Sequence, residues 1–344
     1  MRTLAESLEL PLLVTKAANL RYLTGYVGTN GYLLVEPSRA TFVTDGRYSE
    51  IVEGLMDSID GSDVVVYTEG LEATLGGLFA GDITVESEAV TLSFANALAK
   101  ECSGEIIAGG GAVELLRRIK DDAEVAHLRR AAGAGDAAFE EVLGLAASAG
   151  TEREMAWALV TAMKREGGDV ADWDPIVAVG ANASRPHHET GESSLGDGLL
   201  LVDYGCVVNG YHSDMSRTIW LGGGEPDGDL LTMYDAVLAA QEAAIATVGP
   251  GVPAGEVDKA ARGVLDAAGL GETFLHSTGH GVGLEIHEEP WVRKGSEHEL
   301  EPGNVITVEP GAYVPGVGGV RIEDMILVTD GGAEVLTGST KALR

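Results

Sequence analysis

Short apolar runs alternate with helix-like segments through the first 110 residues of the chain. The apolar runs predict strands and the segments between them predict helices. The expected strands are Leu10–Thr15, Gly31–Val35, Ala40–Thr44, Asp63–Tyr67, Asp82–Glu86 and Gly104–Ala108, and the expected helices are Arg47–Met56, Leu71–Phe79 and Leu92–Lys100. This alternation indicates an α/β domain with its own core.

The pattern changes after a run of three glycines, Gly109–Gly111, and a basic segment at 117–120. We therefore expect one domain over residues 1–112 and a second over 118–344. In the second, two pairs of helices are each followed by a β-rich stretch. The first pair consists of Asp121–Ala147 and a helix that begins with a capping box formed by Thr151 and Glu154, and it is followed by the β-rich stretch Asp174–Leu221. The second pair consists of Asp229–Val248 and Ala254–Ala268, and it is followed by a β-rich stretch up to Leu336. The repeated order suggests an internal duplication, with a site where the two sheets meet.

The segment Leu199–Thr218 predicts two strands joined by a tight turn. Asn209-Gly210 is the strongest short hairpin signal, and a turn there places Asp214 opposite Gly205, with Asp203 two residues further along the same face. The Cβ atoms of the two aspartates would then lie roughly 7–8 Å apart, and a turn one residue earlier would bring them to about 5 Å. In either register both carboxylates lie on one side of a sheet and can hold a shared cation.

Further metal-binding side chains follow in the second repeat. Three histidines lie in HSTGHGVGLEIHEEP, Glu309 lies in VITVEPG, and Glu323 lies in GVRIEDMIL. The set suited to two divalent cations is Asp203, Asp214, His280, Glu309 and Glu323. Oxygen-rich ligands with one imidazole favour Mn²⁺, Co²⁺ or Zn²⁺. Such a set is typical of two-metal hydrolases, in which the metals activate water and polarise a carbonyl.

The charge of the chain excludes several classes of partner. Its 54 acidic and 23 basic residues give a formal net charge of −31. Binding to nucleic acid or to anionic membranes is therefore not expected. Self-repulsion of this size is tolerable where salt screens it, which predicts a halophilic cytoplasm. With two cysteines, no signal-peptide pattern and no run of 18 apolar residues, we expect a soluble cytoplasmic protein without a disulfide framework.

The motifs VDYGCVVNGYHSDMSRT, HSTGHGVGLEIHE, TVEPG and GVRIEDM together resemble the metallopeptidases of the pita-bread fold, which include prolidases, aminopeptidases P and methionine aminopeptidases. The first domain, with YLTGY and TDGRY, resembles the creatinase-type domain that precedes the catalytic domain of Xaa-Pro peptidases. The resemblance implies an α+β protein: a creatinase-type α/β domain followed by a pita-bread catalytic domain. Methionine aminopeptidases usually lack the first domain, and creatinase does not keep the five metal ligands, so both fit less well.

The resemblance also implies a role for each site residue. Asp214 and His280 would bind one metal and Asp203 the second, with Glu309 and Glu323 bridging both. Glu309 would also carry a proton to and from the attacking water. The other residues implied in catalysis are His187 over the active site, His276 at the tetrahedral intermediate, His287 at the substrate, and Arg321 with Tyr313 orienting the ligands. The remaining histidines, interpreted as surface or packing residues, are His127, His188, His212 and His298.

The implied enzyme is a dinuclear Xaa-Pro peptidase, with Mn²⁺ or Co²⁺ expected before Zn²⁺ and a homodimer as its assembly. The two-domain build resembles archaeal prolidases, which favours a dipeptidase from a halophilic archaeon. Some prolidases carry an arginine where this chain has Trp291, with Arg293 two residues on. An aminopeptidase P acting on longer peptides is therefore the close alternative. A non-peptidase amide hydrolase of the creatinase-like group and a catalytically silent binding protein are more distant ones.

Overall fold

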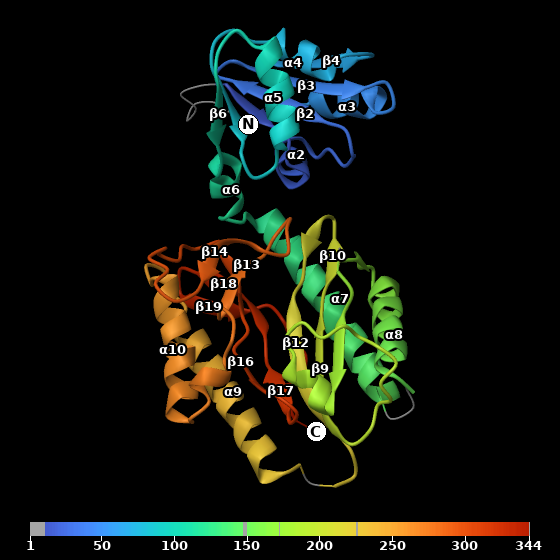
Figure 1. The fold of residues 1–344 in the computed structure, drawn as a ribbon, viewed down its shortest axis with the longest axis vertical. Helices are drawn as coiled ribbons and strands as arrows, with labels where there is room; N and C mark the ends of the chain where they lie inside the picture. The colour runs from blue at the N-terminus through green and yellow to red at the C-terminus, as the bar shows by residue number, and fades with distance from the viewer. Residues whose placement is uncertain (1–10, 147–149, 172, 225, 344) are drawn as a thin grey trace. The chain divides into compact units, whose positions relative to one another are not determined.

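The computed structural model describes residues 11–146, 150–171, 173–224 and 226–343. The chain divides into two compact units, Met1–Arg117 and Arg118–Arg344 (Figure 1). Leu10 and Ala147, which end two of the predicted elements, lie outside the described residues. Within the described ranges, no helix is both long enough and apolar enough to cross a membrane.

The first unit is built on one mixed six-stranded sheet of order β4-β3-β2-β1-β5-β6. Its strands are β1 (Leu12–Val14), β2 (Tyr32–Glu36), β3 (Arg39–Asp45), β4 (Ser62–Tyr67), β5 (Ile83–Glu86) and β6 (Ile106–Gly109). Because successive strand residues point to opposite faces, Leu33 and Val35 enter one hydrophobic cluster and Leu34 enters another. The sheet therefore separates two apolar layers.

Each layer is closed by helices. One cluster takes residues from α2 (Ala17–Thr24), α3 (Ser49–Met56) and α6 (Ala112–Arg117), and the other from α4 (Leu71–Gly76) and α5 (Leu92–Glu101). Helices α2 and α6 were not predicted. In α2 the buried positions include Asn19, whose amide donates to Glu86 Oε1 at 2.6 Å. A polar residue in the core breaks the apolar periodicity on which the prediction depends.

The second unit repeats one order of elements twice. The first half contains α7 (Asp122–Ala146), α8 (Glu152–Arg165), β7 (Asp169–Val170), β8 (Ile176–Val179), β9 (Gly198–Tyr204), β10 (Cys206–Val208), β11 (Tyr211–His212) and β12 (Met215–Leu221). The second half contains α9 (Gly228–Thr247), α10 (Ala254–Ala267), β13 (Gly279–Gly281), β14 (Glu288–Val292), β15 (Val305–Val308), β16 (Gly311–Val314), β17 (Gly318–Arg321), β18 (Asp324–Thr329) and β19 (Gly332–Val335). The capping box at Thr151 and Glu154 is confirmed, since both of its hydrogen bonds are present.

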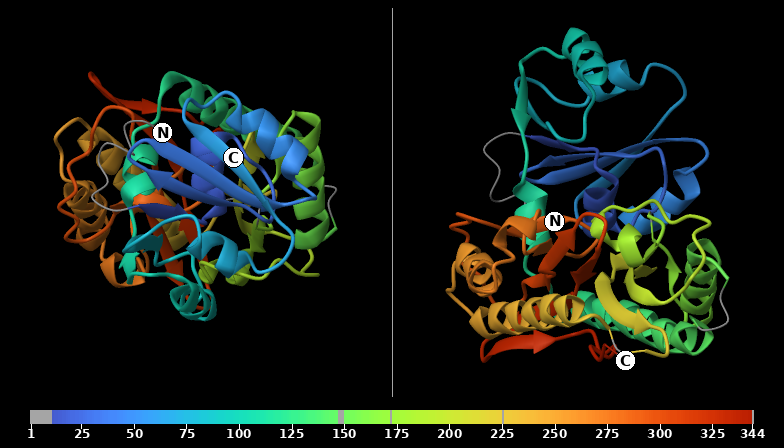
Figure 2. Two further views of the ribbon diagram at one scale, coloured as in Figure 1. Left: turned by 90° about the horizontal axis from the view of Figure 1, so that it is seen from above. Right: turned by 60° about the horizontal axis from the view of Figure 1, so that its bottom comes forward.

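The helix pairs flank the strands of the second unit. Strands β12-β9-β8 form one sheet, and β14-β13-β15-β18-β19 form the larger sheet of the second half. Helices α9 and α10 pack on each other beside the second half, and α7 and α8 do so beside the first (Figure 1). In every view α8 and α10 lie at opposite ends of the unit, with the strands between them (Figure 2).

The predicted hairpin register is confirmed. Val208 pairs with Tyr211, and Met215 pairs with Tyr204. Asn209 and Gly210 have φ values of 49° and 79°, as a two-residue turn with both central residues left-handed requires. The same register places Asp214 opposite Gly205, so that Asp203 and Asp214 share one face.

Strand β12 joins the two halves. The amide of Glu323 donates to Ser216 O at 3.0 Å, and the hydroxyl of Thr218 donates to Arg321 O at 3.0 Å. The buried Arg217 forms an ion pair with Asp324 at 2.7 Å. Residues from both halves are therefore held side by side where the sheets meet.

The C-terminal segment, residues 337–341, completes this junction. Arg217 donates through Nε and Nη2 to the carbonyl of Ser339 at 3.1 and 3.0 Å. The hydroxyl of Thr337 donates to Asp324 Oδ1 at 2.7 Å, and Lys341 forms an ion pair with the same carboxylate. The segment thus contacts the buried side chains of Arg217 and Asp324, and Asp324 directly follows Glu323 in the chain.

Candidate metal centre

A cavity of about 330 Å³ lies at the junction of the two halves of the second unit. Every site residue expected from the sequence, apart from Tyr313, lines it. The lining residues are Pro186, His187, Asp203, Asp214, His276, Ser277, His280, His287, Trp291, Glu309, Arg321 and Glu323. Residues separated by more than a hundred positions in the chain are therefore brought to one place.

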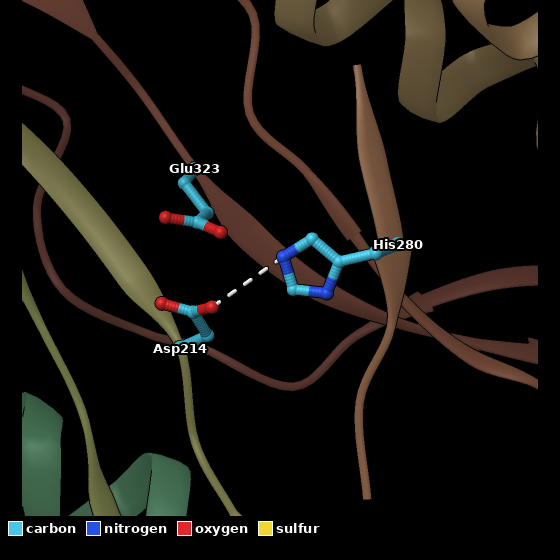
Figure 3. A group of neighbouring side chains, drawn as sticks. All are labelled: Asp214, His280 and Glu323. Atoms are coloured by element: carbon cyan, nitrogen blue, oxygen red, sulfur yellow. Dashed lines mark ion pairs between the residues drawn. The ribbon is translucent and has the colours of Figure 1, made fainter. Parts of the chain in front are cut away.

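Three of these side chains form a compact group. Asp214, His280 and Glu323 each offer one ligand atom, and these atoms all lie within 4.8 Å of one another. Figure 3 shows the three side chains pointing toward a common space from different segments of the chain. Asp214 comes from the first half and the other two from the second. The group has the composition and spacing of a site for a divalent cation.

His280 is oriented as a ligand. Its Nδ1 lies 3.0 Å from Gly281 O, and because a carbonyl only accepts, Nδ1 carries the proton. Burial lowers the pKa of this imidazole to about 3, so the ring is neutral at pH 7. The lone pair of Nε2 then faces Asp214 Oδ2 at 3.6 Å and Glu309 Oε1 at 3.4 Å. Lone pairs that face one another in this way are complementary to a cation placed between them.

The carboxylates around His280 have too few positively charged groups near them to balance their negative charge. Burial, followed by the charges of Asp203 and Glu309, holds the pKa of Asp214 well above its usual range. Burial together with Asp214 and Glu309 does the same for the pKa of Glu323. Burial raises the pKa of Glu309 to about 8, against the lowering effect of Arg321. A bound cation would stabilise the ionised form of each carboxylate.

Only one of the two carboxylate oxygens of Asp203 accepts a hydrogen bond from a described residue. Its Oδ2 accepts from Arg321 Nη2. Its Oδ1 is buried and has no hydrogen-bond partner among the described residues. A buried oxygen without a donor is costly unless an ion satisfies it. Asp203 lies outside the compact group of three, as a ligand to a second, neighbouring cation would. The residues present thus fit divalent metal ions.

Arg321 ties several residues of the centre together. Besides Asp203, it donates to Tyr313 Oη at 2.8 Å and to Ser216 Oγ at 2.9 Å. The hydroxyl of Ser216 in turn donates to Glu323 Oε2 at 2.7 Å. Arg321 is 3% exposed, and its donors are already used within the protein. Its position suits the orientation of ligands rather than direct contact with a substrate.

His276 is held through both ring nitrogens. Tyr313 Oη accepts from Arg321, so its own proton points to His276 Nε2 at 2.9 Å. The ring proton is then on Nδ1, which lies 2.8 Å from Ser277 O and 3.9 Å from Glu309 Oε2. Burial lowers the pKa of His276 to about 4, which keeps it neutral. The ring therefore presents an N–H on the side of Glu309.

The two remaining predicted histidines lie at the open side of the cavity. His187 and His287 are exposed, and both line it. Trp291 stacks on His287 with the ring centroids 6.4 Å apart and an angle of 17° between the planes. The rings of His287 and Trp291 thus form a flat aromatic wall.

The four other histidines lie in packing positions. His188 contacts Glu152 Oε2 at 2.9 Å, and His212 Nδ1 lies 3.2 Å from Gly283 O. His127 stacks on Tyr211, and His298 Nδ1 lies 3.2 Å from Arg118 Nη1. None of the four lines the cavity that holds the candidate centre.

Ser216 and Thr307, which form hydrogen bonds with residues of the centre, were missed by the sequence analysis. Ser216 connects Arg321 to Glu323, as described above, and Thr307 Oγ1 accepts from the amide of His280 at 3.1 Å. A usable signal existed, because Ser216 lies two residues after Asp214 and Thr307 lies two residues before Glu309. Residues two apart on a strand share a face.

Glu288, next to His287 in the chain, forms a buried ion pair with Lys120. The distance from Lys120 Nζ to Glu288 Oε1 is 2.6 Å, and the two side chains are 1% and 5% exposed. Replacing Lys120 by Met is expected to lower the free energy of unfolding of the second unit by about 3 kcal/mol, because it leaves a buried carboxylate without its cation. Urea unfolding followed by tryptophan fluorescence measures this unit, since all four tryptophans belong to it.

The matched control is Lys259→Met, which removes an exposed lysine paired with Glu256 on α10. Exposed pairs contribute about 0–1 kcal/mol, so this variant should unfold close to wild type. Equal effects of the two substitutions would contradict a special role for the buried pair.

Comparison with known proteins places these features in context. Residues 126–330 match Metallopeptidase family M24, and residues 10–119 match the Creatinase/Prolidase N-terminal domain. The chain is 36% identical over 338 residues to the "Uncharacterized peptidase YqhT" of Bacillus subtilis, covering 96% of this chain and 94% of that protein. It superposes on a solved Xaa-Pro dipeptidase from Bacillus anthracis with a TM-score of 0.93 at 36% identity, covering 99% of this chain and 97% of that chain. For an X-Pro aminopeptidase from Thermotoga maritima the TM-score is 0.87 at 28% identity, with 99% of each chain covered.

Proposed function

The chain belongs to metallopeptidase family M24, and from this premise we propose that it hydrolyses the Xaa-Pro bond at the N-terminus of dipeptides or short peptides. The expected fold, a creatinase-type domain followed by a pita-bread catalytic domain, is confirmed, and the protein is a metallopeptidase. A prolidase-type dipeptidase is our favoured form of the activity. The similarity over nearly the whole chain to a Xaa-Pro dipeptidase supports this choice.

One observation carries the proposal: buried carboxylates and a neutral imidazole converge on a cavity without enough positive charge to balance them. Asp214, His280, Glu309 and Glu323 would hold one divalent ion, and Asp203, Asp214 and the two glutamates would hold a second. This donor set suits Mn²⁺ or Co²⁺, and Zn²⁺ also fits it. When bound, such ions polarise the scissile carbonyl and lower the pKa of water.

The protein's own residues would supply proton transfer and orientation. Glu309, whose Oε1 lies 3.4 Å from His280 Nε2, would take a proton from water and return it to the proline nitrogen. His276 would share its Nδ1–H between the carbonyl of Ser277 and the oxygen on which negative charge develops. Arg321 and Tyr313 would hold Asp203 and His276 in place. His187 and His287 would contact the substrate at the cavity mouth.

A proline substrate is consistent with this design. The Xaa-Pro amide has no N–H, so an enzyme that must grip that hydrogen cannot use it. A site that acts on the carbonyl avoids this limitation. The flat wall of His287 and Trp291 is a suitable surface for a proline ring.

Trp291 also favours the alternative, an aminopeptidase P acting on longer peptides. It stands in the cavity wall where some prolidases carry an arginine for the substrate's carboxylate. Arg321 is the only lysine or arginine among the lining residues, and it is already bonded to Asp203 and Tyr313. A dipeptide would therefore need another cation, such as Arg293, which lies over the Trp291 ring at 5.7 Å.

The deciding experiment offers Xaa-Pro dipeptide and Xaa-Pro-Xaa tripeptide to protein loaded with Mn²⁺ or Co²⁺ in molar KCl, with a chelated control. Dipeptide cleavage alone would support the prolidase, and loss of that activity in Arg293→Met would identify its carboxylate-binding residue. Efficient tripeptide cleavage would support the aminopeptidase. If metal binds and neither peptide is cut, the Xaa-Pro proposal is wrong.

We also propose that the protein works in a salt-rich cytoplasm, because its net charge is −31. Raising KCl from about 0.1 M to about 1 M shortens the Debye length from about 10 Å to about 3 Å and so screens repulsion between carboxylates. The melting temperature should rise with KCl over this range. Sucrose of equal osmolality, which does not screen charge, is the control, and a melting temperature indifferent to KCl would contradict the proposal.

A further inference from the structure

A charged pair on α10 faces the segment that carries His276. Asp258 and Arg262 are four residues apart, and Arg262 Nε donates to Asp258 Oδ2 at 2.8 Å. Asp258 is 1% exposed, unlike the carboxylates of an ordinary surface pair. Neither residue lines the cavity of the candidate metal centre.

Arg262 fixes the backbone and one side of His276. Its Nη2 donates to the carbonyl of His276 at 2.6 Å. Its guanidinium also lies over the Phe274 ring at 4.3 Å, and that ring meets the His276 ring edge to face with the centroids 5.1 Å apart. One side chain on α10 thus bonds the main chain of His276 and supports the ring that packs against its imidazole.

Asp258 is connected to Glu309 through Thr278. Its Oδ1 accepts from Thr278 Oγ1 at 2.8 Å and from Thr278 N at 3.3 Å. The carbonyl of Thr278 accepts from the amide of Glu309 at 2.8 Å. A single carboxylate therefore connects α10 to the main chain of Glu309.

We propose that Asp258 and Arg262 are positioning residues of this centre. Together they hold His276 and Glu309 so that His276 Nδ1 lies 3.9 Å from Glu309 Oε2. Tyr313, held by Arg321, bonds Nε2 of the same imidazole, so the main chain and the ring of His276 are fixed by different arginines. The proposal rests on the proposed function, because it assigns these residues to the positioning of His276 and Glu309 for Xaa-Pro hydrolysis.

A second cavity makes the proposal testable by chemical rescue. It has a volume of about 630 Å³ and lies between α10 and residues 294–297, with Asp258, Arg262 and Lys259 among its lining residues. Truncation of Arg262 would extend this space toward the carbonyl of His276. A small guanidinium ion from solution can then occupy the position of the lost side chain.

The experiment compares Arg262→Ala with Lys259→Met, which alters a neighbouring cation in the same cavity that pairs with Glu256. Arg262→Ala is expected to lower kcat about 10²-fold, the usual effect of a displacement of about 1 Å, with KM close to wild type. Methylguanidinium, at concentrations that do not unfold the protein, should raise the kcat of Arg262→Ala and leave Lys259→Met unchanged. Arg262→Gln, which keeps the stem and an amide donor, replaces the alanine variant should that variant not fold.

Two readouts do not depend on activity. The ¹⁵N shifts of the His276 ring, assigned with His276→Gln, should change in Arg262→Ala and return with methylguanidinium, while calorimetric Mn²⁺ affinity stays near wild type. The positioning role would be overturned if the ring shifts do not change in Arg262→Ala. It would also be overturned if kcat falls only in proportion to the loss of metal binding or of folded protein. If wild type cuts no Xaa-Pro peptide, the proposed function is wrong, and the ring shifts still decide whether Arg262 positions His276.

Discussion

Glu323→Gln is expected to abolish peptide hydrolysis and at the same time to raise the melting temperature of the metal-free protein. The activity should fall by about 10³-fold or more, since a bound metal ion supplies several kcal/mol of transition-state stabilisation. The stability should increase because Glu323 is buried among like charges that hold its pKa well above its usual range. The neutral amide needs neither a proton nor a cation in order to be buried there, and it can still accept from Ser216. A gain of 1 kcal/mol would raise the melting temperature by about 2–4 °C in a unit of this size.

Asp330→Asn is the matched control, because Asp330 is an exposed carboxylate directly after β18, the strand that Glu323 directly precedes. It should leave both activity and melting temperature near wild type. If Glu323→Gln hydrolyses peptides as fast as wild type, the assignment of Glu323 to the metal centre is wrong. A lower melting temperature in the chelated variant would mean that the carboxylates do not repel one another.

Removal of the metal should give the protein a pH dependence that the loaded enzyme lacks. The pKa of Glu309 is raised to about 8 in the folded protein from an ordinary 4.5. Between these values the folded state keeps a proton that the unfolded chain releases, so the free energy of unfolding decreases as pH rises. This contribution is complete below about pH 4.5 and is lost as pH rises through 8. Bound metal replaces the proton, so the difference in melting temperature between loaded and chelated protein should grow with pH.

The difference between the two forms is the quantity to measure, because the many other acidic groups titrate in both. Calorimetry of Mn²⁺ binding in buffers with different ionisation enthalpies gives an independent check. It should report proton release on binding at pH 7. Parallel pH dependences of the two forms, together with no proton release, would contradict the assignment of Glu309 as a ligand.

Local signals predicted the half of the site that lies in one hairpin. The Asn209-Gly210 turn determines the register, and the register places Asp203 and Asp214 on one face. His280 and Glu323 are different, because nothing local indicates that β13 and the residue before β18 belong at the same junction as Asp214. Their place in the centre was expected from their residue types, from the internal repeat and from the motif resemblance, and only the packing of the two sheets brings them together.

Residues that act through the backbone were the hardest to predict. Asp258 and Arg262 have the spacing of a surface pair on a helix, and no pattern shows that they bond His276 and Thr278. Helix α2 was missed for a related reason, since buried Asn19 resembles an exposed residue in the periodicity. In each case a polar side chain is satisfied by a partner far away in sequence, which local patterns do not report.

The C-terminal segment has a practical consequence for work with this enzyme. Proteolysis of the peptide bond after Leu336 would remove the carbonyl of Ser339 and the ammonium of Lys341 from Arg217 and Asp324. A buried charge that loses its partner costs about 3–5 kcal/mol, and Asp324 is the direct neighbour of Glu323. A sample nicked at this position would lose its centre while keeping every one of the centre's ligands, so intact mass should be verified before any inactive preparation is interpreted.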